Sequence, residues 1–330
     1  MSLVEVVVPS HGYGHFLREC VGSVLSQTDV DVRVLIIDDA SPDNTAEIAT
    51  ELARADDRVV FRRHEVNQGY LASYNEGLDW LSGDYALILD PDDLLTPGAL
   101  ARAAHLMNTH PEVGMTFGQP IITAAPAAHA YAPPSEFNYQ ILSPSEWLRI
   151  FCANGQNVVS TPTAVVRTSL QKRLGGYRLD LPHTADMELW IRFGLHAPVA
   201  YLRARQAYYR LHAKNMHKDY LGIKDAVHRK AALDAIFREQ RRLIDDSESY
   251  QRMANRGLAR SALRDARKAF DTGDYGECRE LAAFAREVEP RLFEEDPLAE
   301  GLLRASNDGR FSVVAASRYP SGVGRFVPAT

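Results

Sequence analysis

Residues 86–95 read ALILDPDDLL, an apolar run that ends in three aspartates. Four apolar residues without alternation are typical of an interior strand of a parallel sheet, because helices cover both faces of such a strand. An earlier run, VLIIDD (residues 34–39), has the same form and ends in two aspartates. Ligands of open parallel sheets bind at the edge where the strands end. The two runs therefore predict a ligand site at one edge of a sheet, surrounded by carboxylates.

Strand and helix patterns alternate around these two runs. The β-branched run of residues 4–8 and the run RVVFRR of residues 58–63 predict two further strands. A helical pattern follows each strand, as in residues 15–27, where apolar residues recur every three or four positions. Four strand–helix repeats within about 110 residues predict an α/β fold with a mostly parallel, Rossmann-like sheet flanked by helices.

The composition excludes several classes of protein. The chain has 330 residues, 45% of them hydrophobic, which suffices for a sizeable core. A formal charge of -6 and the lack of a basic block predict no nucleic-acid partner. The three separated cysteines fit neither a disulfide framework nor a metal knuckle. No stretch resembles a signal peptide or the roughly 20 apolar residues of a membrane span. We therefore expect a cytoplasmic protein without a membrane span.

The five carboxylates at the predicted edge require a compensating charge. Like charges a few ångströms apart repel one another and shift each other's pKa. Mg²⁺ and Mn²⁺ bind carboxylate, water and phosphate oxygens. We therefore expect a divalent cation and a phosphate group near Asp90, Asp92 and Asp93. The plainer alternative is a solvated acidic turn that precedes a helix.

Two other protein classes place aspartates after an apolar strand. In a phosphatase of the haloacid-dehalogenase type, Asp90 would be the nucleophile and Asp92 the acid. That family opens its chain with the motif, whereas three strands precede the motif here. The position of the motif argues against the phosphatase, which stays an alternative. A receiver domain requires a lysine about half a domain beyond the phospho-accepting aspartate. The first lysine of this chain is Lys172, which argues against a receiver domain.

Five segments in order resemble a family 2 glycosyltransferase of the GT-A fold. They are VEVVVPSHGYGHFLRECVGSVLSQ (residues 4–27), VLIIDDASPDNTAEI (34–48), NQGYLASYNEGL (67–78), LILDPDD (87–93) and GGYRLDLPHTADMELWIRF (175–193). Together with the final strand, the resemblance covers residues 4–212. It implies a metal-dependent enzyme that moves a sugar from a nucleoside-diphosphate sugar to a carbohydrate or glycoconjugate acceptor. A catalytically inactive module that binds sugar nucleotides is a further alternative.

The resemblance also implies roles for individual residues. Asp39 would read the nucleobase of the donor, and Asp92 would be the principal metal ligand. His212 would be a second ligand of the metal or would contact the diphosphate, and Arg210 would contact a phosphate. The remaining positions implied on the nucleotide-sugar side are Pro9, Ser10, Asn67, Gly69, Asp90 and Asp93.

The acceptor hydroxyl must lose its proton as it attacks, and this requires a base. The resemblance places Asp186 in that role, in front of a helix that buries its apolar residues. The family has a glutamate before this aspartate, whereas this chain has Ala185, so Glu188 stays open as the base. A third interpretation is that Asp186 only caps the helix. A single displacement assisted by this base would invert the anomeric configuration.

The chain beyond residue 219 has helical patterns without strand signals. We predict a transferase domain in residues 1–219, a helical extension in residues 220–305 and a flexible tail in residues 306–330. Residues 259–290 resemble one tetratricopeptide helix–turn–helix unit, and a single unit cannot form a solenoid. The helices would then pack on the catalytic domain or form a homo-oligomer. The sequence does not determine the sugar, its nucleotide or the acceptor.

Overall fold

The computed structural model describes residues 1–125, 137–213, 215 and 220–308, which group into two compact units. Unit 1 comprises residues 1–144, 159–182 and 192–215, and unit 2 comprises residues 145–158, 183–191 and the chain from residue 216 onward. Helices α5 (Pro144–Asn154) and α7 (Ala185–His196) include residues of both units. The predicted division into a transferase domain in residues 1–219 and a helical extension from residue 220 stays a prediction.

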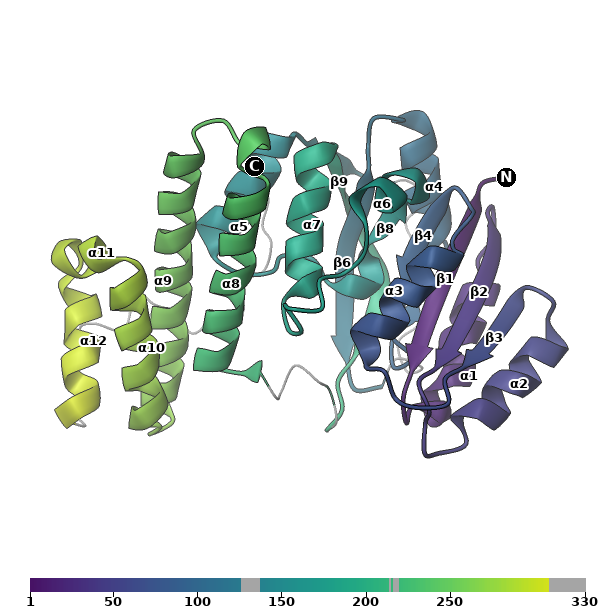
Figure 1. The fold of residues 1–330 in the computed structure, drawn as a ribbon, viewed down its shortest axis with the longest axis horizontal. Coiled ribbons are helices and arrows are strands. Elements are labelled where there is room, and N and C mark those ends of the chain that lie inside the picture. The colour runs from purple at the N-terminus through teal and green to yellow at the C-terminus, as the bar shows by residue number, and fades with distance from the viewer. Residues whose placement is uncertain (126–136, 214, 216–219, 309–330) are drawn as a thin grey trace. The chain divides into compact units, whose positions relative to one another are not determined.

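Unit 1 holds a sheet of nine strands among the described residues (Figure 1). The strand order is β3-β2-β1-β4-β8-β6-β9-β5, and β7 pairs with β9. The strands are β1 (Leu3–Ser10), β2 (Asp31–Asp38), β3 (Val59–Arg63), β4 (Tyr85–Ile88), β5 (Leu94–Leu95), β6 (Met115–Thr123), β7 (Tyr139–Leu142), β8 (Val165–Arg167) and β9 (Val199–Arg210).

The first four strands confirm the predicted parallel arrangement. β1 pairs in parallel with both β2 and β4, and β2 pairs in parallel with β3. Helices connect successive strands, namely α1 (Gly14–Leu25), α2 (Thr45–Ala55) and α3 (Tyr70–Trp80). The opening run is an interior strand as expected, since Leu87, Ile88 and Leu89 are each at most 6% exposed. Parallel pairing places the carboxyl ends of β1, β2 and β4 at one edge.

The other strands make the sheet mixed overall. β8 is antiparallel to β4 and β6, whereas β5 and β7 are antiparallel to β9. β5 has two residues and β8 has three, so neither leaves a recognisable pattern in the sequence. Two further helices of unit 1 are α4 (Ala99–Thr109) and α6 (Thr168–Leu174), with a 3₁₀ turn, η2, at Thr161–Thr163.

The core of unit 1 forms where α1 covers the parallel strands. Leu17, Cys20, Val21 and Val24 lie on one face of α1 and are fully buried. They belong to the same hydrophobic cluster as Val4, Val6 and Val8 of β1. Burial of such a side chain contributes roughly 1.5–3 kcal/mol. Cys20 is thus a core residue, and Cys152 and Cys278 are likewise buried and unoxidised.

Unit 2 is helical in its described residues. Besides its parts of α5 and α7, it contains α8 (Ile223–Glu239), α9 (Ser247–Asp271), α10 (Tyr275–Val288), α11 (Pro290–Glu295), α12 (Pro297–Asp308) and a 3₁₀ turn, η4 (Arg241–Leu243). Helices α9 and α10 form the predicted helix–turn–helix, and Gly273 has φ +83° in the turn. Gly257 of α9 packs on α5, because a Cβ there would lie 2.1 Å from the carbonyl oxygen of Cys152.

The end of the chain bears on two expectations. Residues 306–308 belong to α12 rather than to a tail, and residues 309–330 of the predicted tail lie outside the described residues. Within the part of the chain that the structure describes, no helix combines the length and the apolar character needed to cross a membrane.

Candidate active site

Two groups of aspartates follow strands β2 and β4, which flank β1, at one edge of the parallel sheet. Ser10 at the end of β1 pairs with Asp38 at the end of β2, and the backbone N–H of Asp39 donates to the carbonyl of Ser10 (2.9 Å). On the other side of β1, the N–H of Leu89 donates to the carbonyl of Val7 (2.9 Å). Strand β1 therefore separates two clusters, Asp38–Asp39 and Asp90–Asp93, at the same edge of the sheet.

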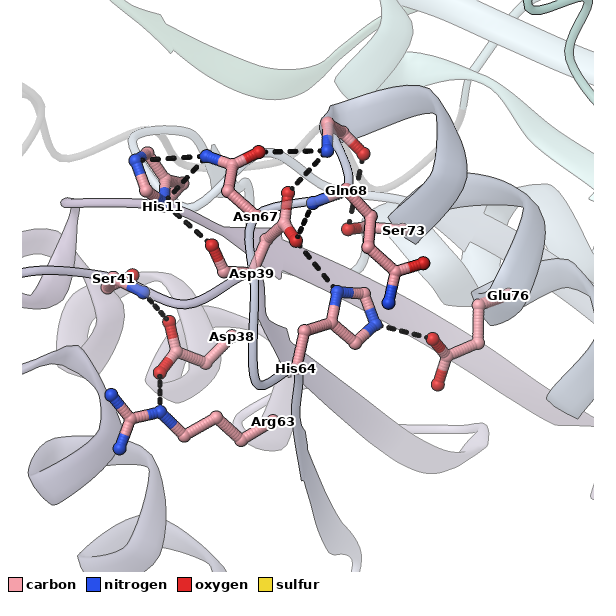
Figure 2. A network of polar contacts seen from close by, with 11 residues as sticks. His11, Asp38, Asp39, Ser41, Arg63, His64, Asn67, Gln68, Ser73 and Glu76 are labelled. Atoms are coloured by element: carbon pink, nitrogen blue, oxygen red, sulfur yellow. Dashed lines mark hydrogen bonds and ion pairs between the residues drawn. The ribbon is translucent and has the colours of Figure 1, made fainter.

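Asp39 lies at the centre of a network of polar contacts (Figure 2). Its Oδ1 accepts from the N–H of Gln68 and lies 2.7 Å from Nδ1 of His64, and its Oδ2 accepts from the N–H of Gly69 (2.8 Å). Its side chain is 4% exposed. Burial raises the pKa of Asp39, but these hydrogen bonds outweigh burial and lower it overall. Asp39 is therefore an ionised carboxylate that the loop before α3 holds in place.

His64 connects Asp39 to α3. Its Nε2 lies 2.6 Å from Oε2 of Glu76, on the side opposite to Asp39 (Figure 2). Burial lowers the pKa of His64, whereas its hydrogen bonds to Asp39 and Glu76 raise it, and the net shift is upward. The pKa of Glu76 shifts downward, since hydrogen bonds from His64 and Arg62 outweigh burial. The sequence reasoning missed His64 and Glu76, although His64 directly follows β3 at the same edge as Asp39.

Asp38 contacts its own loop and the end of strand β3. Its Oδ1 accepts from the N–H of Ser41 (2.9 Å), and its Oδ2 lies 3.1 Å from Nε of Arg63.

Of the residues expected near the nucleobase, Ser10 is 3% exposed, and its Oγ has no hydrogen-bond partner among the described residues. Pro9 is also buried.

Asn67 and Gly69 shape the turn that reaches Asp39. Oδ1 of Asn67 accepts from the N–H of Gly69 (2.9 Å), and its Nδ2 lies 3.2 Å from Nε2 of His11. Gly69 has φ +89°, and a Cβ added there would meet no protein atom within 4 Å. Glycine is thus required by the backbone conformation, since side chains disfavour positive φ.

Asn75 on α3 binds the backbone next to Gly175 and Gly176. Its Oδ1 accepts from the N–H of Tyr177 (2.7 Å), and its Nδ2 donates to the carbonyl of Tyr177 (2.9 Å). A Cβ at Gly176 would lie 2.2 Å from this amide. The ring of Tyr177 also packs edge-on against Tyr74, at 5.1 Å between ring centroids.

The second cluster brings together five residues predicted from the sequence. Oδ2 of Asp92 lies 2.8 Å from Nε2 of His212. Oδ1 of Asp93 accepts from the backbone N–H of Arg210 (3.0 Å), and the guanidinium of Arg210 donates to the carbonyl of Asp92 (2.8 Å). Oδ1 of Asp90 accepts from the hydroxyl of Tyr74 (2.5 Å). Strand β9 ends at Arg210 and thus brings Arg210 and the following His212 to the loop after β4, more than a hundred residues away in the chain.

Burial, followed by the crowding of carboxylates, determines the electrostatics of this cluster. Burial and the charges of Asp92 and Asp90 raise the pKa of Asp93 well above its ordinary value, against the opposing effect of Arg210. Oδ2 of Asp93 is buried and has no hydrogen-bond partner among the described residues. Burial, followed by Asp92 and Asp90, raises the pKa of Tyr13 to about 12. The cluster therefore carries more negative charge than its protein surroundings compensate.

The donor set of this cluster fits a divalent cation. Carboxylate oxygens suit Mg²⁺ or Mn²⁺, and the buried oxygen of Asp93 lacks a compensating partner. A neutral imidazole is a common further metal ligand. Among the described residues, however, no three His, Cys, Asp or Glu side chains are already arranged to hold a metal ion. Asp92 and His212 are adjacent, so at least one further ligand would have to come from water or from a bound phosphate.

Asp186 and Glu188 belong to unit 2. Asp186 lies inside the first turn of α7, not before the helix as expected, and Oδ1 accepts from the N–H of Met187 (2.7 Å). Its Oδ2 accepts from Nδ2 of Asn157 (2.8 Å), and the residue is half-buried. Glu188 is only 2% exposed. Of the two carboxylates, Asp186 is the more accessible to a substrate.

Comparisons with known proteins agree with the resemblance in the sequence. Residues 5–165 match the model of the family described as glycosyl transferase family 2. The glycosyltransferase GlyG of Streptococcus pneumoniae is 36% identical over 94 residues, which cover 28% of this chain and 31% of GlyG. The matched segments span 64%, 35% and 31% of three curated relatives.

Two solved structures share the fold along almost the whole chain. A crystal structure of S. aureus TarS in complex with UDP-GlcNAc has a TM-score of 0.66 at 17% identity and covers 94% of this chain and 88% of that one. The mannosyltransferase PcManGT from Pyrobaculum calidifontis, in complex with GDP-Man and Mn²⁺, has a TM-score of 0.55 at 16% identity, with 96% and 86% covered. The fold is therefore GT-A, and residues 5–165 match the model of glycosyl transferase family 2.

Proposed function

We propose that this protein is an inverting glycosyltransferase that uses a nucleoside-diphosphate sugar and a divalent cation. The acceptor would be a hydroxyl group of a carbohydrate or glycoconjugate. The main support is the pair of clusters at one edge of the sheet, one an ordered carboxylate and the other a crowded acidic group. The family 2 domain and the ligands named for TarS and PcManGT support the same class of donor.

The Asp39 cluster would bind the nucleobase. A carboxylate offers about four acceptor positions, and Asp39 uses three of them for Gln68, His64 and Gly69. The remaining position, at Oδ2, would accept a ring N–H of uracil, thymine or guanine. Pro9 and the buried hydroxyl of Ser10 lie at the end of the adjacent strand and would line the same pocket.

The Asp90–Asp93 cluster would hold the diphosphate through the cation. Asp92 and His212 would bind the Mg²⁺ or Mn²⁺, which supplies positive charge to the leaving diphosphate. Asp90, oriented by the hydroxyl of Tyr74, would face the ribose or the water shell of the cation. Arg210 pairs with Glu19, which is half exposed, and a phosphate would replace Glu19 in that contact.

The base would be Asp186, whose orientation Asn157 fixes. We expect Asp186→Asn to lower turnover by about 10²–10⁴-fold, because a positioned base contributes that much, and to leave nucleotide binding unchanged. Glu188→Gln is the matched comparison, measured with the same transfer assay and nucleotide titration. Near-full turnover of Asp186→Asn with a large loss in Glu188→Gln would show that Glu188 is the base.

A thermal-stability screen tests the proposal as a whole. Each of UDP, dTDP and GDP is added with and without Mn²⁺, and one nucleotide should stabilise the protein only when Mn²⁺ is present. At about 100 times its Kd, a ligand stabilises the folded state by about 2.7 kcal/mol. Indifference to every nucleotide would overturn the proposal and favour the phosphatase. Binding without any hydrolysis or transfer of sugar nucleotides would identify an inactive binding module. A cytoplasmic location and self-association through the C-terminal helices stay predictions.

A further inference from the structure

His64 lies between two carboxylates, with each ring nitrogen in contact with one of them. Nδ1 is 2.7 Å from Oδ1 of Asp39, and Nε2 is 2.6 Å from Oε2 of Glu76 (Figure 2). The side chain of His64 is 7% exposed. The ring is therefore fixed at both ends and largely shielded from water.

These two contacts determine the protonation state of the ring. A neutral imidazole has one donor nitrogen and one acceptor nitrogen, whereas a carboxylate only accepts. With a neutral ring, one nitrogen lone pair would face a carboxylate oxygen at hydrogen-bonding distance. Only the imidazolium form donates to both Asp39 and Glu76. The positive charge thus belongs to the folded arrangement.

The charge also fixes the carboxylate of Asp39. Oδ1 is held by His64 together with the N–H of Gln68, while Oδ2 is held by the N–H of Gly69. Without the donor at Nδ1, the two backbone contacts that remain come from adjacent residues of one loop. His64 comes from β3 and fixes the rotation of the carboxylate from a different direction.

We propose that His64, held by Glu76, is a positioning residue that keeps Asp39 oriented for the nucleobase of the donor. Nucleotide affinity should therefore fall when His64 loses its proton. The inference rests on the proposed function, because it assumes that Asp39 contacts the nucleobase. It adds a pair of residues, His64 and Glu76, and a pH dependence to that binding site.

Other charged groups near His64 modify this behaviour. Arg62 lies 3.2 Å from Glu76 and is 45% exposed, and Arg63 pairs with the buried Asp38. The two arginines oppose the charge on His64, and burial does so as well, whereas the two carboxylates favour it. The net effect is a pKa above the ordinary value of 6.5. The contribution of protonated His64 to the stability of the folded state is therefore fully present below about pH 6.5. It is lost as the pH rises through the folded-state pKa of His64.

The variant Glu76→Gln tests this inference. The glutamine has the size of the glutamate but no charge, so His64 should titrate at least about one pH unit lower than in the parent protein. Two measurements follow the change in the full chain, namely an NMR titration of the His64 ring and the affinity for the nucleotide that the parent binds, with Mn²⁺, from about pH 5 to about pH 8. The nucleotide affinity of the parent protein should stay constant to a higher pH than that of Glu76→Gln. At about pH 8, the affinity of Glu76→Gln should have fallen at least about tenfold.

Two further variants complete the test. Arg62→Gln removes a cation from Glu76, so His64 should titrate at higher pH than in the parent. Glu112→Gln is the matched control, since Glu112 pairs with His110 elsewhere in unit 1 (3.3 Å), and it should change neither measurement.

The possible results separate this inference from the proposed function. If Glu76→Gln lowered affinity equally at every pH, the pair would be merely structural and the inference would be wrong. The same holds if His64 titrated at its ordinary value in the parent protein. If the parent bound no nucleotide at any pH, the proposed function would fail, and this inference with it.

Discussion

The two acidic clusters lie at one edge of the same sheet, yet their charges are balanced in different ways. Asp39 has a lowered pKa, because His64 and two backbone N–H groups donate to it. Asp93 has a pKa well above its ordinary value, because it is buried beside Asp92 and Asp90. The protein therefore supplies the compensating charge at Asp39 from its own residues and leaves an excess of negative charge at Asp90–Asp93.

Under the proposed function, this difference would let one sheet edge bind two parts of one ligand. A preorganised carboxylate suits an uncharged nucleobase, since it can read a hydrogen-bond donor without rearranging. An excess of negative charge suits a cation, and the cation in turn suits a diphosphate. Strand β1 sets the spacing between the two clusters, because it is paired with both β2 and β4.

The largest expected effect lies at the acidic cluster. Asp92→Asn should lower kcat/KM by about 10²–10³-fold, because a bound cation contributes about 3–4 kcal/mol to stabilising the leaving group. The stabilisation by nucleotide should also lose its dependence on Mn²⁺. Asp57→Asn, at an exposed carboxylate of unit 1, is the control in the transfer assay and the thermal screen. Unchanged Mn²⁺ dependence in Asp92→Asn would break the comparison between the clusters.

The next effect lies at the preorganised cluster. Asp39→Asn should destabilise the protein without ligands by about 2–3 kcal/mol, because it removes the charge that His64 and the backbone donors require. The pKa of Asp39 in the folded protein is lowered from 3.8. The contribution of ionised Asp39 to stability is therefore fully present above about pH 3.8, and it is lost as the pH falls through the folded-state pKa. Thermal unfolding at neutral and acidic pH measures it. A loss of equal size at both would contradict the ionised state of Asp39.

The smallest effect has the opposite sign. Asp93→Asn should stabilise the protein without ligands by about 1 kcal/mol, since it removes a buried carboxylate that its neighbours repel while an oxygen still accepts from Arg210. The apparent Tm should rise by about 2–4 °C. Opposite changes in the unfolding midpoints of Asp39→Asn and Asp93→Asn would sharpen the comparison. A lower midpoint in Asp93→Asn would mean that its charge is already compensated in the free protein.

Sequence reasoning reached the strands that carry the site, because each has a local signature. The runs before Asp38 and Asp90 are apolar without alternation, and both are interior strands. His64 was missed although it follows a predicted strand, since a single histidine in a loop has no distinctive spacing. Tyr74 and Glu76 were missed because they project from a helix whose rotation depends on packing.

Residue types and their order along the chain determined the α/β class, the parallel half of the sheet and the edge where the aspartates gather. These follow from the sequence because burial on two faces demands continuous apolar runs, and parallel pairing aligns their ends. The resemblance already implied that Asp92 and His212 share a metal, but only the tertiary structure decided that His64 separates two carboxylates and that His212 contacts Asp92 directly. Such contacts depend on strand order and helix packing between segments up to 120 residues apart, which local patterns do not record.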